Sequence, residues 1–342
     1  MASHVRRLWL NGYNVPETDV YIFRLLQHCR NLLSATLPWT VVHHGSVEDW
    51  KALLGEGGCR KGLVSLELLA VDLKQKQVAA ASHYIAANPF QDGQVDFSGL
   101  KRLKIFGDTK FRPIGDDDLE DMAATAVNLE EVHVTGNSSV GIQGVMALVT
   151  ASCQTLRVLE FSPLSHEGFM HPDLSKIHTE NHLCEELPRC TKLRDLSISL
   201  PSLCPQFFSL SYPVRWSGDL QIRAATLCGE PRQHSHEKVN SQNLRRILDS
   251  ARAAIEAREH EGSSLDIEIF ISNWIFDPRS RLVHGDFDLV EVASDFTWPP
   301  SKMPSGKGPY GQTGLYEKEE GQYSSVSEET FFQGLQHQHI TF

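Results

Sequence analysis

A six-residue pattern of apolar residues recurs along the chain and limits the folds that it can adopt. In its clearest stretch the pattern reads Leu100-x-x-Leu103-x-Ile105, then Leu129-x-x-Val132-x-Val134, then Leu156-x-x-Leu159-x-Phe161, with starts 29 and 27 residues apart. Further copies lie near residues 5–10, 32–37, 63–68, 193–198 and 220–222. Repetition at this period is typical of a protein built by stacking one short structural unit.

Each copy of the pattern predicts a short β-strand. Side chains alternate between the two faces of a strand, so the fourth and sixth residues point inward and the third, fifth and seventh point outward. The segments between copies have helical spacing, as in Leu119, Met122 and Ala126. One strand and one helix cannot bury an apolar face alone, so the units must stack. We therefore predict an α/β leucine-rich repeat solenoid, a horseshoe with a parallel concave sheet and helices on its convex side.

The repeats and a C-terminal cap are predicted to occupy residues 1–275. The cap is a helix and a strand over residues 241–271, because Leu244, Ile247 and Ala251 form an apolar stripe and residues 265–271 alternate. Residues 276–342 are assigned to a partly disordered tail, since Pro and Gly are frequent between 298 and 314. Within this tail, the spacing of residues 331–335 favours a short helix that docks against the rest of the fold.

Composition excludes several classes of partner. Asp and Glu outnumber Lys and Arg by 43 to 32, the net charge is -11, and no run of basic residues occurs. Nucleic acid and anionic membrane are therefore not expected as partners. No apolar stretch approaches the ~18 residues that span a bilayer, and the N-terminus lacks the apolar run of a signal peptide. We expect a cytoplasmic or nuclear protein.

Cysteines and acidic runs favour structural roles over metal binding. Cys29, Cys153 and Cys190 each lie three residues before a copy of the pattern, Cys59 lies four before, and no Cys-x-x-Cys pair occurs. Such positions predict reduced thiols that pack as small apolar side chains. Residues 116–118 are all Asp and are interpreted as a helix start rather than a cation site. No metal and no cofactor are expected.

The outward strand positions are the candidate binding residues. On the concave face of a solenoid they would contact a protein partner, and the predicted contact residues are Arg7, Trp9, Arg102, Lys104, Phe106, Glu131, His133, Glu160 and Asp195. Aromatic residues next to Arg are typical of interaction hot spots. This face runs from basic and aromatic to acidic, which would orient a partner of opposite pattern. The alternative is that these positions are only solvated and that loops bind the partner.

A glycine-rich segment provides the only hint of an enzyme. Gly306-x-Gly308-x-x-Gly311 matches the dinucleotide-binding fingerprint in letters, but Pro304 precedes it and Pro309 lies inside it. The fingerprint needs a strand before it and a helix after it, so a turn-rich linker is the preferred interpretation. A nucleotide-binding enzyme is the lesser alternative. No Gly-x-Ser-x-Gly, His-Glu-x-x-His or P-loop motif occurs, and we predict that the protein is not an enzyme.

Two repeats carry a resemblance to a known family. Cys153-x-x-Leu156-x-x-Leu159 and Cys190-x-x-Leu193-x-x-Leu196 resemble the repeats of F-box/leucine-rich-repeat proteins. Residues 5–10, 37–39 and 306–314 are similar to filamentous-fungal proteins of this kind, and the repeat pattern covers roughly residues 5–200. The resemblance implies the substrate receptor of a ubiquitin ligase, in which repeats hold the substrate and an F-box binds the ligase adaptor.

The chain departs from this family in two ways. It begins inside its first repeat, so we expect no F-box, and a ligase adaptor is an expected partner only if an F-box is supplied elsewhere. The asparagine expected at the ninth position of each repeat occurs as Asn137 but is replaced by Asp108, Leu164 and Pro201. The predicted function is a protein–protein interaction module, with an adaptor unrelated to ubiquitin as the alternative.

Overall fold

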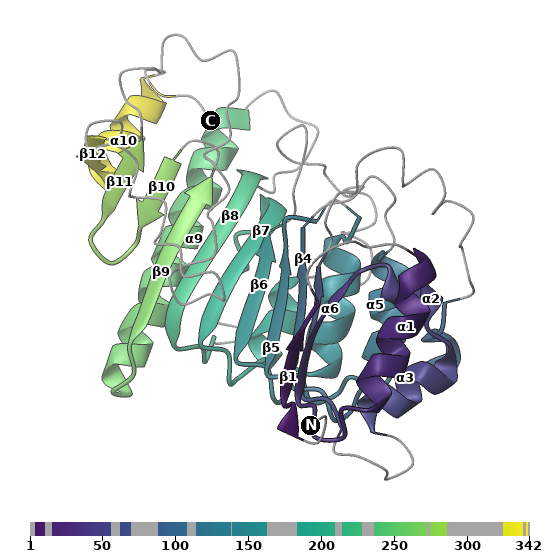
Figure 1. The fold of residues 1–342 in the computed structure, drawn as a ribbon. Coiled ribbons are helices and arrows are strands. Elements are labelled where there is room, and N and C mark those ends of the chain that lie inside the picture. Colours follow the sequence, from purple (N-terminus) through teal and green to yellow (C-terminus); the bar gives the residue numbers. More distant parts are fainter. Residues whose placement is uncertain are drawn as a thin grey trace. The chain divides into compact units, whose positions relative to one another are not determined.

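The chain separates into two compact units, Met1–Ser165 and His166–Phe342, which Figure 1 draws as a ribbon. The computed structural model describes residues 4–10, 16–55, 62–69, 88–107, 114–137, 139–162, 183–208, 214–227, 236–271, 274–285, 324–337 and 340.

Among its described residues, the first unit contains six parallel strands that follow chain order. They are β1 (Arg7–Trp9), β2 (Ser34–Pro38), β3 (Ser65–Leu69), β4 (Arg102–Phe106), β5 (Glu131–Thr135) and β6 (Val158–Ser162). Each strand coincides with one copy of the apolar pattern, and equivalent pattern positions pair between neighbours. Leu103 and Leu159 point inward and have no exposed surface, as predicted. The register therefore repeats the sequence pattern strand by strand.

Helices of the first unit lie on one face of its strands (Figure 1). They are α1 (Pro16–Gln27), α2 (Val41–His44), α3 (Val47–Leu54), η2 (Gln91–Gly93), α5 (Asp116–Ala123) and α6 (Ile142–Ala151). In the core of the N-terminal repeats, the ring of Trp50 packs edge-on against Phe23 and Phe90, and its centroid lies 5.3 and 5.1 Å from theirs. The longer connections there thus contribute large aromatic residues to the core.

Short polar side chains connect successive repeats. Asp116 begins α5, and its carboxylate accepts hydrogen bonds from the backbone N–H groups of Gly141 (2.7 Å) and Gly144 (3.1 Å) at the start of α6. Asp118 accepts from Gly115 N–H at 2.8 Å. Ser152, which is fully buried, accepts from Leu129 N–H at 3.1 Å and donates to a backbone carbonyl of the same preceding repeat. The acidic run is therefore a helix start, as predicted, and it also caps the next helix.

Asn137, the residue at the ninth pattern position, makes local bonds. Its side-chain oxygen accepts from the backbone N–H groups of Ser139 (2.8 Å) and Val140 (3.0 Å), and the residue is 1% exposed. Of the cysteines before the pattern, Cys29 and Cys190 are buried as predicted and Cys153 is half-buried. Cys59 lies outside the described residues.

The second unit contains a mixed sheet. Its strands are β7 (Asp195–Leu203), β8 (Gly218–Leu227), β9 (Leu265–Ile271), β10 (Trp274–Asp277), β11 (Leu282–Gly285) and β12 (Ser324–Ser327). Strands β7, β8 and β9 are parallel, whereas β9 through β12 pair antiparallel. Its helices are α8 (Leu183–Glu186), η3 (Leu187–Arg189), α9 (His236–His260) and α10 (Glu328–Gln336). The predicted α/β class and mostly parallel pairing are confirmed.

The sheet of the second unit continues past the predicted cap. Helix α9 and strand β9 occupy the cap region, but β11, β12 and α10 lie in residues 276–342, which the sequence analysis assigned to a tail. Phe331 of α10 has no exposed surface, and its ring lies 5.2 Å from that of Phe276. Burial of this aromatic residue holds α10 against the added strands. None of the described helices, including the 25-residue α9, is apolar enough over sufficient length to cross a bilayer.

Replacement of an inward leucine tests the repeat register. Leu103→Ala should lower the free energy of unfolding by about 2–5 kcal/mol, because it removes a buried side chain and leaves a cavity. Val127→Ala is the matched control, since Val127 is 45% exposed. Urea denaturation followed by circular dichroism measures both. Equal stability of the two variants would mean that the inward face is misassigned.

The hydroxyl of Ser152 provides a second test. Ser152→Ala should cost about 1–3 kcal/mol, because a buried N–H group and a buried carbonyl lose their partner. Gln154→Ala, at an exposed position two residues away, should change stability little. The same denaturation experiment compares them, and a stability of Ser152→Ala within error of wild type would show that the backbone finds other partners.

Candidate functional site

The outward side chains of the first unit form three rows across its strands. The middle row contains Trp9, Thr36, Glu67, Lys104, His133 and Glu160, which are paired in register from β1 to β6. A flanking row contains Arg7, Ser34, Ser65, Arg102, Glu131 and Val158, and the other contains Pro38, Leu69, Phe106, Thr135 and Ser162. We call these three rows the outer face. It brings together eight of the predicted contact residues.

The ninth predicted residue, Asp195, lies on β7 of the second unit. It is paired in register with Asp219 on β8, which is paired with Asp266 on β9. Asp266 forms an ion pair with Arg279 at 3.1 Å. The sequence analysis missed this row of aspartates, although the third position of each strand pattern would have revealed it.

A chain of charged side chains crosses the outer face from β4 to β6. The guanidinium of Arg102 donates two hydrogen bonds to the carboxylate of Glu131, at 2.6 and 2.9 Å. His133 Nδ1 lies 2.8 Å from Glu160 Oε2, a hydrogen bond. His133 Nε2 lies 3.6 Å from Glu131 Oε2, which is longer than a hydrogen bond, so we treat this contact as an ion pair. Adjacent strands lie about 4.8 Å apart, so residues in register reach each other directly.

The carboxylates control the protonation of His133. Burial lowers the pKa of His133, but Glu131 and Glu160 raise it by more, so this pKa lies above its ordinary value of 6.5. The pKa of Glu131 falls from 4.5 to about 2, since His133 lowers it most, burial opposes the change and Arg102 lowers it further. Burial, and then Arg102, lower the pKa of Lys104. Histidinium and carboxylate thus stabilise each other within the sheet face.

Exposure divides the outer face into two parts. Trp9 is 68% exposed and Phe106 is 38% exposed, whereas His133 and Glu160 are each only 5% exposed. Arg7 is exposed, and Arg102, Lys104, Glu67 and Glu131 are partly exposed. The aromatic and basic part, on β1 to β4, is therefore open to a partner. His133 and Glu160, which the sequence analysis predicted as contacts, are enclosed in this structure.

Several polar side chains of the outer face are paired with one another. Thr36 donates a hydrogen bond to Glu67 at 2.9 Å, and the Arg102–Glu131 and His133–Glu160 pairs satisfy most of the remaining charge. Within the described residues, no group of three or more His, Cys, Asp or Glu side chains is arranged to hold a metal ion. The segment Gly306–Gly311, considered as a nucleotide site, lies outside the described residues.

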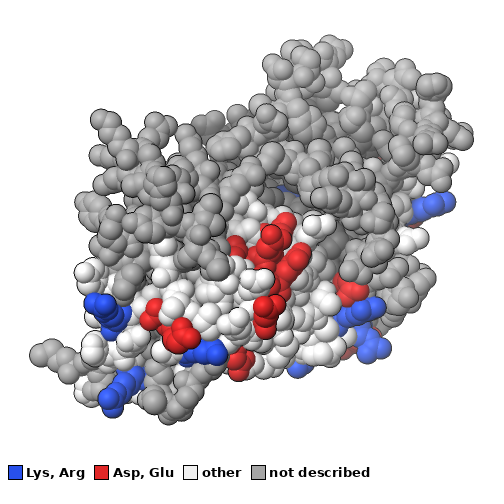
Figure 2. All heavy atoms as spheres, turned by 90° about the vertical axis from the view of Figure 1, so that its right-hand side faces the viewer, with Lys and Arg blue, Asp and Glu red and all other residues white. Residues whose placement is uncertain are grey.

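Acidic residues also concentrate away from the strands. On α5, burial first and then repulsion from neighbouring carboxylates raise the pKa of Glu120 and of Asp121. Figure 2 shows one face of the molecule, with Asp and Glu side chains gathered near its centre and Lys and Arg nearer its margins. Asp116 and Asp118 in the first turn of α5 accept hydrogen bonds from backbone N–H groups, so these two carboxylates have structural roles.

The chain matches no protein-family model and no curated protein. The functional argument therefore depends on the geometry of the described residues.

The charged chain on the outer face predicts a pH dependence of stability. His133 has a raised pKa, so its contribution is full below about pH 6.5 and is lost as the pH rises through the raised value. Glu131 has a pKa lowered from 4.5 to about 2, so its contribution is full above about pH 4.5 and is lost as the pH falls toward 2. Together they should stabilise the protein most between these limits.

Thermal unfolding across pH 3–9 measures this dependence. Relative to wild type, His133→Gln should lose the decline in melting temperature above pH 6.5, and Glu131→Gln should lose the decline below pH 4.5. His28→Gln, at an exposed position after α1, is the control and should keep the wild-type profile. A wild-type profile in the His133 variant would contradict the assignment.

Proposed function

We propose that the chain is a leucine-rich repeat protein that binds another protein on the outer face of its first unit. The observation that carries this proposal is the unbroken register from β1 to β6, which aligns outward side chains over six strands. On the part of the outer face formed by β1 to β4, Trp9 and Phe106 are exposed. Exposed aromatic residues beside basic ones are enriched at interaction hot spots. A rigid sheet presents them with little loss of entropy on binding.

The charges favour a partner of particular chemistry. Arg102 is neutralised by Glu131, whereas neither Arg7 nor Lys104 forms an ion pair among the described side chains. Two available cations beside two aromatic rings are complementary to a segment that carries carboxylates and apolar side chains. Such binding should weaken as salt rises, because the cations are at least partly exposed.

The resemblance noted in the sequence extends the proposal to a specific role. In this role the protein is the substrate receptor of an F-box-like ubiquitin ligase in the cytoplasm or nucleus, with the client on the outer face. The repeat pattern supports this role, and ligase recruitment would require an F-box. An adaptor in another pathway would use the same face. No observation on the described residues favours a nucleotide-binding enzyme.

Affinity capture with face variants tests the proposal. The full chain, its Trp9→Ala/Lys104→Gln variant and a Tyr21→Ala/Lys101→Gln control are purified from native cells, and co-purifying proteins are quantified by mass spectrometry. Tyr21, on α1, is 63% exposed, and Lys101 is paired with Glu130 at 3.5 Å beside the strand. The face variant should lower recovery of the partner at least about tenfold, the size of a hot-spot loss.

The partners that depend on the face decide between the roles. Ligase subunits that all three proteins recover, together with ubiquitinated clients that are lost with the face variant, would support the receptor role. If a partner unrelated to ubiquitin ligases is lost with the face variant, the assignment of the outer face as a binding surface would stand and the receptor role would be excluded. Equal recovery of every partner by all three proteins would contradict the assignment of the outer face.

A further inference from the structure

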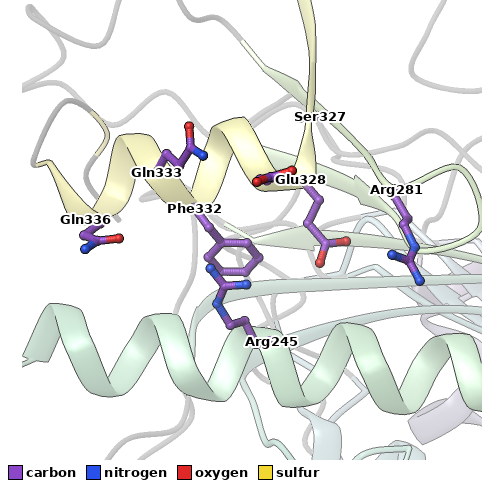
Figure 3. A pocket seen from close by; sticks show the side chains of 8 residues that line it. Arg245, Arg281, Ser327, Glu328, Phe332, Gln333 and Gln336 are labelled. Atoms are coloured by element: carbon purple, nitrogen blue, oxygen red, sulfur yellow. The ribbon is translucent and has the colours of Figure 1, made fainter.

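A pocket of about 570 Å³ lies in the second unit, between α9, the turn before β11 and helix α10. Its lining includes Arg245, Arg281, Glu328 and Phe332, and Figure 3 shows that these side chains come from three elements, with Arg245 against Phe332 and Arg281 on the separate turn. This volume falls within the range of small-molecule sites in proteins. The lining residues that the structure describes all belong to the second unit, so inferences about the pocket do not depend on the outer face.

Arg245 is held flat in this pocket. Its guanidinium carbon lies 3.7 Å from the centroid of the Phe332 ring, and Figure 3 shows the group against that ring. Phe332 itself is 3% exposed, so the platform is fixed by the core. Stacking on an aromatic ring uses the face of the guanidinium and leaves its in-plane N–H groups available to donate. Arg245 is therefore preorganised to bind an oxyanion.

A neighbouring arginine neutralises the nearest carboxylate. Arg252 forms hydrogen bonds to Glu328 at 2.6 and 3.2 Å. Neither Arg245 nor Arg281 forms an ion pair with any side chain that the structure describes. Glu328 lines the pocket, but its charge is already compensated, so it competes little for these two cations. The pocket thus contains two uncommitted guanidinium groups and one exposed carboxylate, that of Glu329.

Arg281 is positioned by the backbone rather than by a side-chain partner. Its φ of 56° lies in the left-handed region, which non-glycine residues adopt infrequently. Its carbonyl accepts a hydrogen bond from Glu328 N–H at 3.0 Å, which ties the turn to the first residue of α10. The turn therefore fixes the backbone of Arg281 at the pocket, and its exposed guanidinium remains available to a ligand.

We propose that this pocket binds the phosphate group of a small phosphomonoester, with Arg245 and Arg281 as its ligands. A phosphomonoester carries a charge of about −1.5 to −2 and three acceptor oxygens. Two guanidinium groups therefore match it better than they match a ligand with a single carboxylate. The double charge also outweighs the repulsion from Glu329. The pocket is larger than a phosphate group, so space remains for the organic part. Gln333 and Gln336 line the same pocket, and their side-chain amides can donate hydrogen bonds to a ligand there.

Calorimetric titration of the full chain with phenyl phosphate, at constant ionic strength, tests this site. Wild type should show saturable binding. Arg281→Gln should weaken it at least tenfold, and Arg245→Gln should do the same, because each removes one cation. Arg246→Gln is the matched control: Arg246 is exposed, adjacent on α9 and absent from the pocket lining. Since Arg245→Gln also removes the contact with Phe332, Arg281→Gln is the decisive variant.

Three results would overturn the proposal. The first is the absence of saturable binding by wild type at millimolar phenyl phosphate. The second is unchanged binding by Arg281→Gln in a protein with wild-type circular dichroism. The third is equal affinity for benzoate, which would show that the pocket does not distinguish a phosphate group from a carboxylate.

Discussion

The register between parallel strands is the constraint on which the first unit depends. Leu66, Leu103, Val132 and Leu159 are paired with one another across four strands, and none has exposed surface. A shift of one residue in any strand would turn its apolar side chains outward and its polar ones inward. The same register builds the outer face, because the residues between the apolar positions must then point to the opposite side. Core and candidate binding face are therefore two results of one alignment.

Much of this alignment could be predicted from the sequence, and some of the site as well. Period-two alternation separates inward from outward residues without knowledge of the fold. Arg102 and Glu131 occupy the same pattern position 29 residues apart, and His133 and Glu160 do so 27 residues apart. Neighbouring parallel strands bring such positions together, so these pairs could have been anticipated. Alternation alone assigns a face but gives no measure of exposure, and the burial of His133 and Glu160 could not be predicted from it.

The connections between repeats and the C-terminal elements were harder to predict. Asp116 and Ser152 bond backbone groups more than 20 residues away, and no local pattern indicates which backbone group such a side chain will reach. Asn137 fits the expected repeat position, and its hydrogen bonds to described residues stay within its own turn. Strands β11 and β12 are four residues each, too short for a clear alternation. Only Phe331, in a helical spacing, indicated that this region packs on the core.

Arginine is held in two contrasting ways in this protein, and the contrast explains why each site is assigned as it is. Arg102 shares two hydrogen bonds with Glu131, so its charge holds the sheet face together and contributes little to partner attraction. Arg252 does the same for Glu328. Arg245 instead stacks on an aromatic ring, which fixes its position without neutralising its charge. A cation held in place by packing keeps its hydrogen-bond donors for a ligand, whereas one held by a carboxylate does not. Packing, rather than the number of arginines, therefore distinguishes the pocket from the paired network.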